Sequence, residues 1–333
     1  MRQLLFLVPG TGGKFACGGL WAELKTVQLA REICSAEVVT YRRREANTLF
    51  LDDLLQSPAV DDKIFVVSWG FDVPKLARRL RNYHTVYHAH SAEYGFQLPA
   101  NVPIITVSRH TMGYWGQRAP HSLIYYLPNQ ISDEFRDLSL PRDIDVLVQA
   151  RKSSRYLLQM LVPALQQHCE VMVVNSYVED LPGLFNRARV YLYDSAEYWA
   201  MQGVTEGFGL QPLEAIACGC HVFSSVNHGL SDYLDPGFNC QKIAGVSLEY
   251  DVHRILKTLQ RREPNNISET LLKEYRKENI LYRLQRILAE VNEFFDTSKQ
   301  YPANIPDLTA MRIWRLRSQR TFNQLKKLWS KNS

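Results

Sequence analysis

Short apolar runs alternate with longer stretches of helical spacing from the N-terminus to about residue 260. This alternation predicts an α/β protein with parallel sheets, because each strand is followed by a segment long enough to cross over as a helix. In the first half the helix predicted over 20–33 follows a glycine-rich loop, as in a βαβ unit. The strands predicted there are 4–8, 37–40, 64–68, 85–88, 104–107 and 123–126.

A polar, proline-containing connector, LSLPRD, divides the chain at residues 138–143, and a new strand–loop–helix pattern follows it. We therefore expect two Rossmann-like domains facing a central cleft, with ligands at the carboxyl ends of the strands. The predicted domains are 1–139, 140–300 and a basic C-terminal segment 301–333 that packs back on the first domain. In the second half the predicted strands are 144–149, 170–174, 190–193 and 221–224, and the helices are 156–167, 269–295 and 307–329.

The composition is that of an ordinary globular protein, with 333 residues, 46% hydrophobic and 22% charged. No apolar run approaches the roughly 18 residues that a membrane span needs. The N-terminal run ends at once in Pro9-Gly10, which predicts a first strand rather than a signal peptide. The six cysteines are scattered, which favours reduced thiols and a cytoplasmic location. Cys218 and Cys220 are too few for a metal site, and helix packing explains them better.

The net charge of +5 is spread unevenly, with basic clusters at 42–44, 78–81 and 312–331. Such clusters suit phosphorylated substrates, an anionic membrane surface or nucleic acid. No nucleic-acid-binding motif is present, so we do not expect a nucleic-acid partner.

Residues 205–234, TEGFGLQPLEAIACGCHVFSSVNHGLSDYL, are the most informative stretch of the chain. Glu206 and Glu214 flank a Gly-Phe-Gly turn and the start of an Ala-rich helix. Gly207 and Gly209 let the backbone approach a ligand closely, and free N–H groups at the helix start form an anion cradle. N–H donors beside two carboxylates suit a ligand with phosphates and hydroxyls, such as a nucleotide-sugar.

Two further groups lie where strands end at the predicted cleft. Arg151 and Lys152 directly follow the strand 144–149, where cations stabilise a departing diphosphate. His88 ends the strand 85–88, and His90 lies two residues after it. Metal binding by these two histidines lacks an evident third ligand in the sequence.

The string over residues 204–222 resembles the E-x7-E signature of retaining glycosyltransferases of the GT-B fold, known as glycosyl transferases group 1 or family 4. His221 stands where the family usually has proline. The resemblance implies that Glu214 binds the ribose hydroxyls and that Glu206 binds the sugar hydroxyls. It also implies that N–H groups of Phe208, Gly209 and Leu210 bind the phosphates.

Other segments resemble the same family in the same order. Gly18-Gly19 resembles the glycine pair before the first helix, and one of the two histidines corresponds to the family's histidine near the donor sugar. Arg151 matches a family arginine, with either Lys152 or Arg155 as the second phosphate-binding cation. Further matching segments are Pro128-Asn129, followed by Gln130 where the family has glycine, and Gly229 with Asp232.

The resemblance implies a metal-independent enzyme that moves a sugar from a nucleotide diphosphate donor to a hydroxyl of a glycan, lipid or small molecule, without a cofactor. Two alternatives stay open, which are a GT-B protein that binds such ligands without turnover and a sugar-nucleotide epimerase. An Asp-x-Asp triplet exists at Asp143-Ile144-Asp145, but its place at a strand start argues against a metal role.

The predicted C-terminal helix 307–329 is amphipathic and basic. Trp314, Thr321, Leu325 and Leu328 recur at helical spacing, and seven cations face one acid, Asp307. Packing on the first domain explains the apolar stripe. The cation excess also allows a peripheral contact with an anionic membrane or a phosphorylated lipid acceptor.

Overall fold

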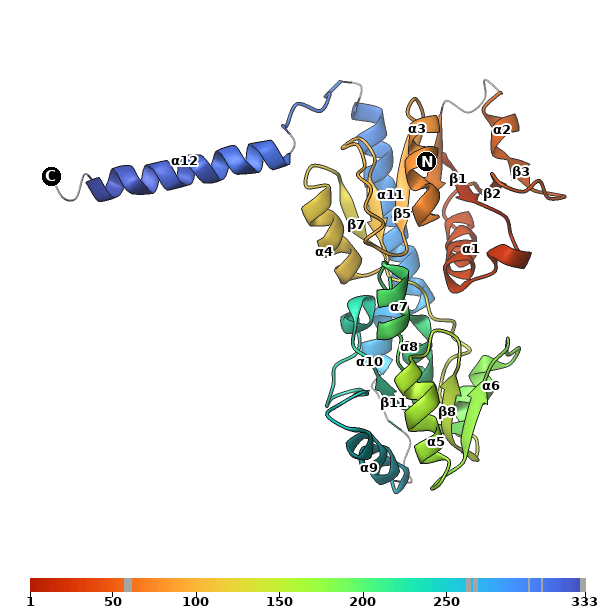
Figure 1. The fold of residues 1–333 in the computed structure, drawn as a ribbon. Helices are drawn as coiled ribbons and strands as arrows, with labels where there is room; N and C mark the ends of the chain where they lie inside the picture. The colour runs from red at the N-terminus through yellow and green to blue at the C-terminus, as the bar shows by residue number, and fades with distance from the viewer. Residues whose placement is uncertain (57–61, 262–264, 266–268, 299, 307, 330–333) are drawn as a thin grey trace.

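Two parallel β-sheets, each covered by helices, form two bodies stacked one above the other in the computed structural model (Figure 1). The structure describes residues 1–56, 62–261, 265, 269–298, 300–306 and 308–329, and within the last range the side chains of 325, 328 and 329 lie outside the description. No helix among the described residues is long and apolar enough to cross a membrane.

The first sheet has the strand order β3-β2-β1-β4-β5-β6-β7, and its pairings are parallel. Its central strands are nearly continuous apolar runs, because helices cover both faces of a parallel sheet. The strands are β1 Gln3–Val8, β2 Ala36–Thr40, β3 Leu49–Phe50, β4 Lys63–Val67, β5 His84–Ala89, β6 Ile104–Thr106 and β7 Ile124–Tyr126.

The second sheet has the order β12-β11-β10-β8-β9 and is also parallel. The predicted connector at 138–143 falls between the last strand of the first sheet and the first strand of the second. The strands are β8 Ile144–Gln149, β9 Val171–Val174, β10 Ala188–Tyr193, β11 His221–Ser224 and β12 Gln241–Lys242.

The helices follow the βαβ pattern that the sequence predicts. Those of the first half are α1 Gly18–Arg31, α2 Leu51–Leu54, α3 Val73–Arg79 and α4 Arg109–Arg118. Those of the second half are α5 Val162–Leu165, α6 Leu181–Arg187, α7 Ala196–Gln202, α8 Leu210–Ala217, α9 Leu248–Leu259, α10 Glu269–Leu272, α11 Lys277–Thr297 and α12 Ala310–Trp329. Short helical turns are η1 Gly13–Phe15, η3 Gly70–Asp72, η4 Leu157–Leu161, which is a π-helix, η5 His228–Asp232 and η6 Lys273–Tyr275.

The helix predicted over 269–295 is interrupted in the structure. Arg276 has an extended backbone and separates η6 from α11. Its guanidinium donates hydrogen bonds to the carbonyls of Ser132 (2.9 Å) and Phe135 (3.0 Å). These bonds fix the chain where it passes from the second domain to the first. The break lets α11 leave the second domain and return to the first.

The helix that packs on the first domain is α11, not the basic C-terminal helix. Its buried side chains, among them Leu284, Leu288 and Val291, join one core cluster with Leu4 and Phe6 of β1. Residues 277–297, which we assigned to the second domain, therefore belong with the first in packing.

The described side chains of α12 are exposed, apart from a partly buried Arg312, and the helix projects away from both domains (Figure 1). The prediction that this segment packs back on the first domain is corrected, because α11 already covers the apolar face of the sheet. Asp307 and Lys331, and the side chains of Leu325 and Leu328, lie outside the described residues.

Candidate functional site at the domain junction

The loop after β5 and the loop before α8 bind one another directly, which joins the two domains at the predicted site. The Ser91 hydroxyl donates to the carbonyl of Thr205 (2.5 Å), and the Ala92 N–H donates to the Thr205 hydroxyl (3.0 Å). These contacts place the histidine segment of the first domain beside the E-x7-E segment of the second.

The glycines of the motif are required by this close packing. A Cβ on Gly207 would overlap the carbonyl oxygen of His90, and a Cβ on Gly229 would overlap the carbonyl oxygen of Gly207. Gly209 has a φ of +74°, in the left-handed region that favours glycine, at the residue before α8. The three backbone segments can meet here because Gly207 and Gly229 carry no side chain at the points of contact.

Glu206 is a buried carboxylate held by three side chains of the second domain. Tyr193 at the end of β10 and Trp199 of α7 each donate a hydrogen bond of 2.6 Å to Oε2. The ammonium of Lys152 lies 3.3 Å from Oε1 and 4.5 Å from the centre of the Trp199 ring. The outcome is a charged, hydrogen-bonded cluster at the carboxyl ends of β8 and β10. Tyr193 and Trp199 are not predicted as site residues from the sequence, although Tyr193 ends a predicted strand.

The three candidate cations after β8 have different surroundings. Lys152 has a φ of +69°, which turns its side chain toward Glu206, where it is about a quarter exposed. Arg155 is 78% exposed and its guanidinium lies 3.8 Å from Glu197. Arg151 is exposed. The structure thus brings Lys152, but not Arg155, to the Glu206 carboxylate.

Glu214 is buried on α8 and lacks the dense hydrogen bonding of Glu206. Burial raises the pKa of its carboxyl to about 7, against a smaller lowering effect from the positive charge of Lys25 on α1. The carboxyl of Glu214 therefore titrates near neutral pH.

Two helix starts supply backbone donors near the junction. The first N–H groups of α8 begin at Leu210, after Gly209, and no side chain caps them. Phe208 itself is buried, with its ring packed against Tyr233 and Tyr275. At the start of α1 both residues of the pair 18–19 are exposed, and an added Cβ would meet nothing closer than 3.9 Å.

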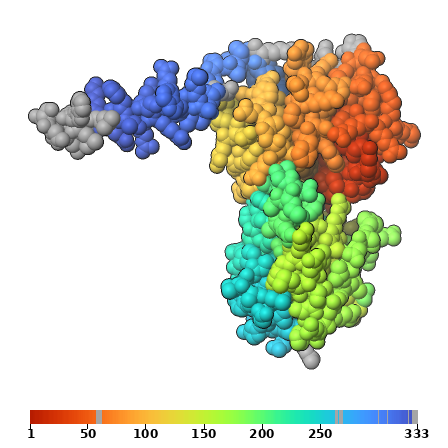
Figure 2. All heavy atoms as spheres, in the orientation of Figure 1, coloured from red at the N-terminus to blue at the C-terminus, as the bar shows by residue number. Residues whose placement is uncertain are grey.

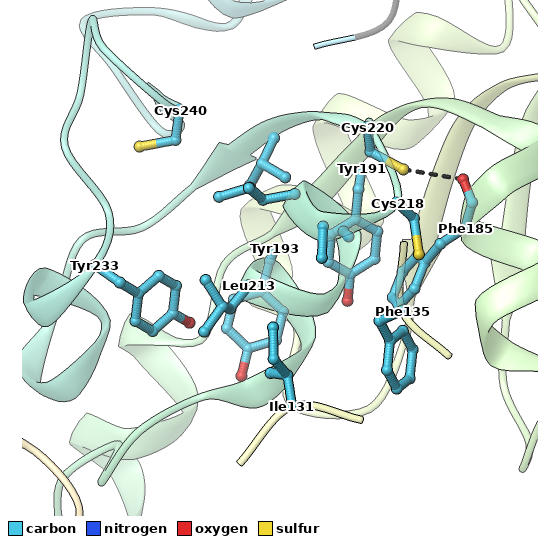
Figure 3. Close-up of a cluster of buried hydrophobic side chains, with 14 of the residues drawn as sticks. Ile131, Phe135, Phe185, Tyr191, Tyr193, Leu213, Cys218, Cys220, Tyr233 and Cys240 are labelled. Atoms are coloured by element: carbon cyan, nitrogen blue, oxygen red, sulfur yellow. Dashed lines mark hydrogen bonds between the residues drawn. The ribbon is translucent and has the colours of Figure 1, made fainter. Parts of the chain in front are cut away.

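The core beneath α8 fixes the position of the motif. Figure 3 shows Leu213 of α8 among the aromatic side chains of β10, with Cys218 and Cys220 at one end. The Cys220 thiol donates to the carbonyl of Phe185 (3.1 Å), and burial raises the pKa of this thiol to about 12. Both cysteines are packing residues, as the sequence analysis predicts.

The two histidines of the first domain share one buried carboxylate, that of Glu23 on α1. His88 Nδ1 lies 2.5 Å and His90 Nε2 lies 2.8 Å from the same oxygen, Oε2. Burial alone would raise the pKa of the Glu23 carboxyl, but charge and hydrogen bonds from both histidines hold it well below its usual range. Burial lowers the pKa of His90, as does the charge of His88, against the opposite effect of Glu23.

Glu23, His88 and His90 are also the one group among the described residues whose ligand atoms, all within 4.8 Å of one another, could hold a metal ion. The expectation that the histidines lack a third ligand is wrong, because Glu23 supplies it from 65 residues away in the chain. Without an ion, both histidines already contact Oε2 of Glu23, while Oε1 has no partner among the described residues. His88 Nε2 has no hydrogen-bond partner among the described residues, so the second shell that usually orients a metal-bound imidazole is missing.

Asp143 and Asp145, the acids of the Asp-x-Asp triplet, are paired with arginines. Asp143 lies 2.6 Å from Arg187, and Asp145 lies 3.1 Å from Arg189. Both pairs lie at the start of β8, at the opposite end of the strand from Lys152.

Asp232 of η5 contacts the first domain. Its carboxylate accepts hydrogen bonds from the N–H groups of Arg109 (2.5 Å) and His110 (3.4 Å), at the start of α4. It therefore ties the second domain to a helix N-terminus of the first. Gln130, at the position of the family's glycine, lines a small cavity with Lys25 and His88.

Comparisons with known proteins agree with this fold. Residues 152–266 match the model of the family "Glycosyl transferases group 1". The match lies within the second domain. No curated protein matches the chain by sequence.

Solved structures share the fold over both domains. The chain is similar to sucrose-phosphate synthase from Thermosynechococcus elongatus, with 14% identity, a TM-score of 0.61, and 87% of this chain and 99% of that chain covered. It is similar to a glycosyltransferase from Rickettsia africae, with 12% identity, a TM-score of 0.64 and coverages of 87% and 98%. It is also similar to HepE from Anabaena in complex with UDP, with 14% identity, a TM-score of 0.59 and coverages of 87% and 100%. The two Rossmann-like domains form the GT-B fold, and with the group 1 match in its second half this protein is a glycosyltransferase.

Proposed function

We propose that this glycosyltransferase transfers a sugar from a nucleotide diphosphate sugar to an acceptor hydroxyl, with retention of the anomeric configuration and without a metal. The observation that carries the proposal is the cluster of Glu206 with Lys152, Tyr193 and Trp199 beside the uncapped start of α8.

The donor would lie along the start of α8, and each group there has a matching partner. The N–H groups of Gly209 and Leu210 and the positive end of the helix dipole favour the diphosphate. Glu214 accepts hydrogen bonds from the ribose hydroxyls. Glu206 accepts hydrogen bonds from the hydroxyls of the sugar, in exchange for the contact with Lys152.

Catalysis in this proposal rests on stabilising the leaving diphosphate. Lys152 and Arg151 face the charge that develops on its oxygens when the bond to the sugar breaks. We choose Lys152 over Arg155 as the second cation because only Lys152 reaches the Glu206 cluster. The leaving phosphate then accepts the proton of the acceptor hydroxyl on the same face of the sugar, which retains the configuration.

The Glu23 carboxylate has a positioning role in this proposal. It fixes the orientation of both histidine rings. Of the two histidines, His90 is the one whose backbone carbonyl packs against Gly207. His90, the more exposed of the two at 13%, is our choice for the histidine that faces the donor sugar. The free cysteines support a cytoplasmic location.

A donor panel tests the proposal. HepE binds UDP and UDP-glucose, so UDP-sugars are the first candidates, followed by GDP- and ADP-sugars. A true donor raises the melting temperature, because it binds only the folded state. Release of nucleoside diphosphate that depends on a glycan, lipid or small-molecule acceptor is the expected result.

Two results would contradict the proposal. Binding without acceptor-dependent turnover would indicate a degenerate binding protein, and release of nucleotide with a sugar isomer in the absence of an acceptor would indicate an epimerase. Glu206→Ala should abolish turnover while the protein stays folded, with Glu197→Ala, at the exposed partner of Arg155, as the matched control.

A further inference from the structure

The helix α12, Ala310–Trp329, stands away from the two domains (Figures 1 and 2). Several of its large apolar side chains face water, with Met311 80%, Trp314 71% and Phe322 66% exposed. Isolated helices of this length are marginal in water, and most gain their stability by burying an apolar face. A partner for α12 is therefore expected outside the described part of the chain.

The largest exposed apolar side chains of α12 gather on one side of the helix axis, while Ile313 and Leu316 lie among the cations on the other side. Met311, Trp314 and Phe322 follow the spacing of one helix face, with the small Ser318 between them. The helix carries six cations and no acidic residue. The cations fall mainly outside the aromatic face, at positions Arg312, Arg315, Arg317, Arg320, Lys326 and Lys327.

The contrast with α11 excludes a role in the core. α11 has acidic and basic residues on its outer face and buries its apolar side chains against β1 and α1. The first domain has no need of a second helix on that face. A partner for α12 must be anionic and must also offer an apolar layer.

We propose that α12 lies in the plane of an anionic lipid membrane and holds the enzyme at its surface. Met311, Trp314 and Phe322 enter the boundary between headgroups and acyl chains, and the arginines and lysines bind the phosphates of the headgroups. Tryptophan is enriched at this boundary because its ring is apolar with one polar N–H. This inference concerns a surface outside the catalytic site and does not depend on the identity of the donor.

Two other partners fit the surface less well. A second copy of α12 would bring six cations against six, which opposes pairing in water. A nucleic acid would satisfy the cations through its phosphates but would leave the aromatic face in water.

Sedimentation of the full-length protein with lipid vesicles tests the proposal. The protein should pellet with vesicles of phosphatidylcholine and phosphatidylglycerol at low salt, and much less with phosphatidylcholine alone. The double variant Arg315→Glu/Arg320→Glu should lower the partition coefficient by roughly tenfold or more, since each basic residue contributes to attraction at an anionic surface. Arg81→Glu, an exposed arginine of the first domain, is the matched control.

A second pair of variants tests the apolar face. Phe322→Ala and Trp314→Ala should weaken binding to the same vesicles, while Tyr282→Ala should not. Tyr282 is a suitable control because it is 64% exposed on α11, close to the 66% of Phe322. Melting temperatures of all variants should match the parent, as expected for exposed positions.

Three outcomes would overturn the proposal. Failure to pellet with anionic vesicles at low salt is the first. Binding that the charge reversals leave unchanged is the second. The third is a dimer, or a complex with DNA, that Trp314→Ala abolishes while vesicle binding is absent.

Discussion

Two buried glutamates lie on opposite sides of the domain junction, and they differ in the groups that contact each carboxylate. Glu206 in the second domain receives two neutral donors on one oxygen and the partly exposed Lys152 on the other. Glu23 in the first domain receives both histidines on one oxygen, and its other oxygen is buried without a partner among the described residues.

The difference separates a group that can bind a ligand from one that holds other groups in place. At Glu206 the lysine contact can be exchanged for a sugar hydroxyl, because the lysine reaches solvent and the glutamate keeps its other donors. At Glu23 no exchange is open, since the carboxylate is 2% exposed and both neighbours are ring nitrogens fixed by the strand end. A buried carboxylate near a cleft is thus not by itself a ligand site.

After the loss of turnover in Glu206→Ala, the largest effect that we expect comes from removing the cation beside Glu206. Lys152→Ala should lower kcat by about 10²- to 10³-fold, as removal of one group that stabilises transition-state charge does. Arg155→Ala is the control and should stay within about threefold of the parent, since that side chain points to Glu197 and solvent. Steady-state kinetics with the best donor measures both, and equal losses in the two variants would contradict the assignment of Lys152.

Replacement of Glu23 should lower the stability of the folded protein. Glu23→Gln removes the charge that both histidines share and should lower the free energy of unfolding by about 2 to 4 kcal/mol. Glu37→Gln breaks an exposed pair with Arg31 and should cost no more than about 1 kcal/mol. Urea unfolding at neutral pH compares the two. If Glu23→Gln is as stable as the parent, the histidines do not need this carboxylate.

The raised pKa of Glu214 predicts that donor binding depends on pH. Its pKa of about 7 exceeds the ordinary value of 4.5, so the folded protein takes up a proton there more readily than the unfolded chain. Without ligand, stability therefore falls as the pH rises from about 4.5 to about 7. Ribose hydroxyls favour the ionised form, so donor affinity should rise by up to about tenfold per pH unit below pH 7 and level off above it.

Glu214→Gln should remove this dependence and bind the donor more weakly at pH 8. Titration calorimetry across pH 5.5 to 8.5, roughly the window around that pKa, measures both proteins. A parent whose affinity is flat with pH would show that Glu214 does not meet the ribose.

The smallest effect expected is that of metal removal. EDTA should leave turnover unchanged, because in the one candidate cluster among the described residues both histidines are already paired with the Glu23 carboxylate. Addition of zinc or manganese after EDTA should likewise change nothing. Activity that is lost in EDTA and restored by a metal would place an ion at Glu23 and the histidines, and the comparison would then need revision.

The sequence was sufficient for the longer strands, because buried parallel strands are short apolar runs with turns at both ends; the two-residue edge strands β3 and β12 were not predicted. The strand 144–149 is predicted with the bounds that β8 has, and 104–107 differs from β6 by one residue. The GT-B architecture was predictable as well, through the residues 204–222.

The long-range features were beyond the sequence. Glu23 lies on a helix whose burial pattern is ordinary, and only the folded chain shows that it faces His88 and His90. Trp199 is one of several aromatic residues in its segment, so nothing marks it as the donor to Glu206. That α11, and not α12, packs on the first domain depends on the extended backbone at Arg276. The side chain of Arg276 is held there by the carbonyls of Ser132 and Phe135, which are distant in the sequence.

The anomeric configuration of the product tests the central claim most directly. Nuclear magnetic resonance of the product formed in EDTA, from an α-linked nucleotide-sugar, measures it through the coupling of the anomeric proton. A retaining transferase with Glu206 and Lys152 at the donor gives an α-linked product. A β-linked product would contradict the account, since it requires attack from the opposite face of the sugar and a base that this site does not place there.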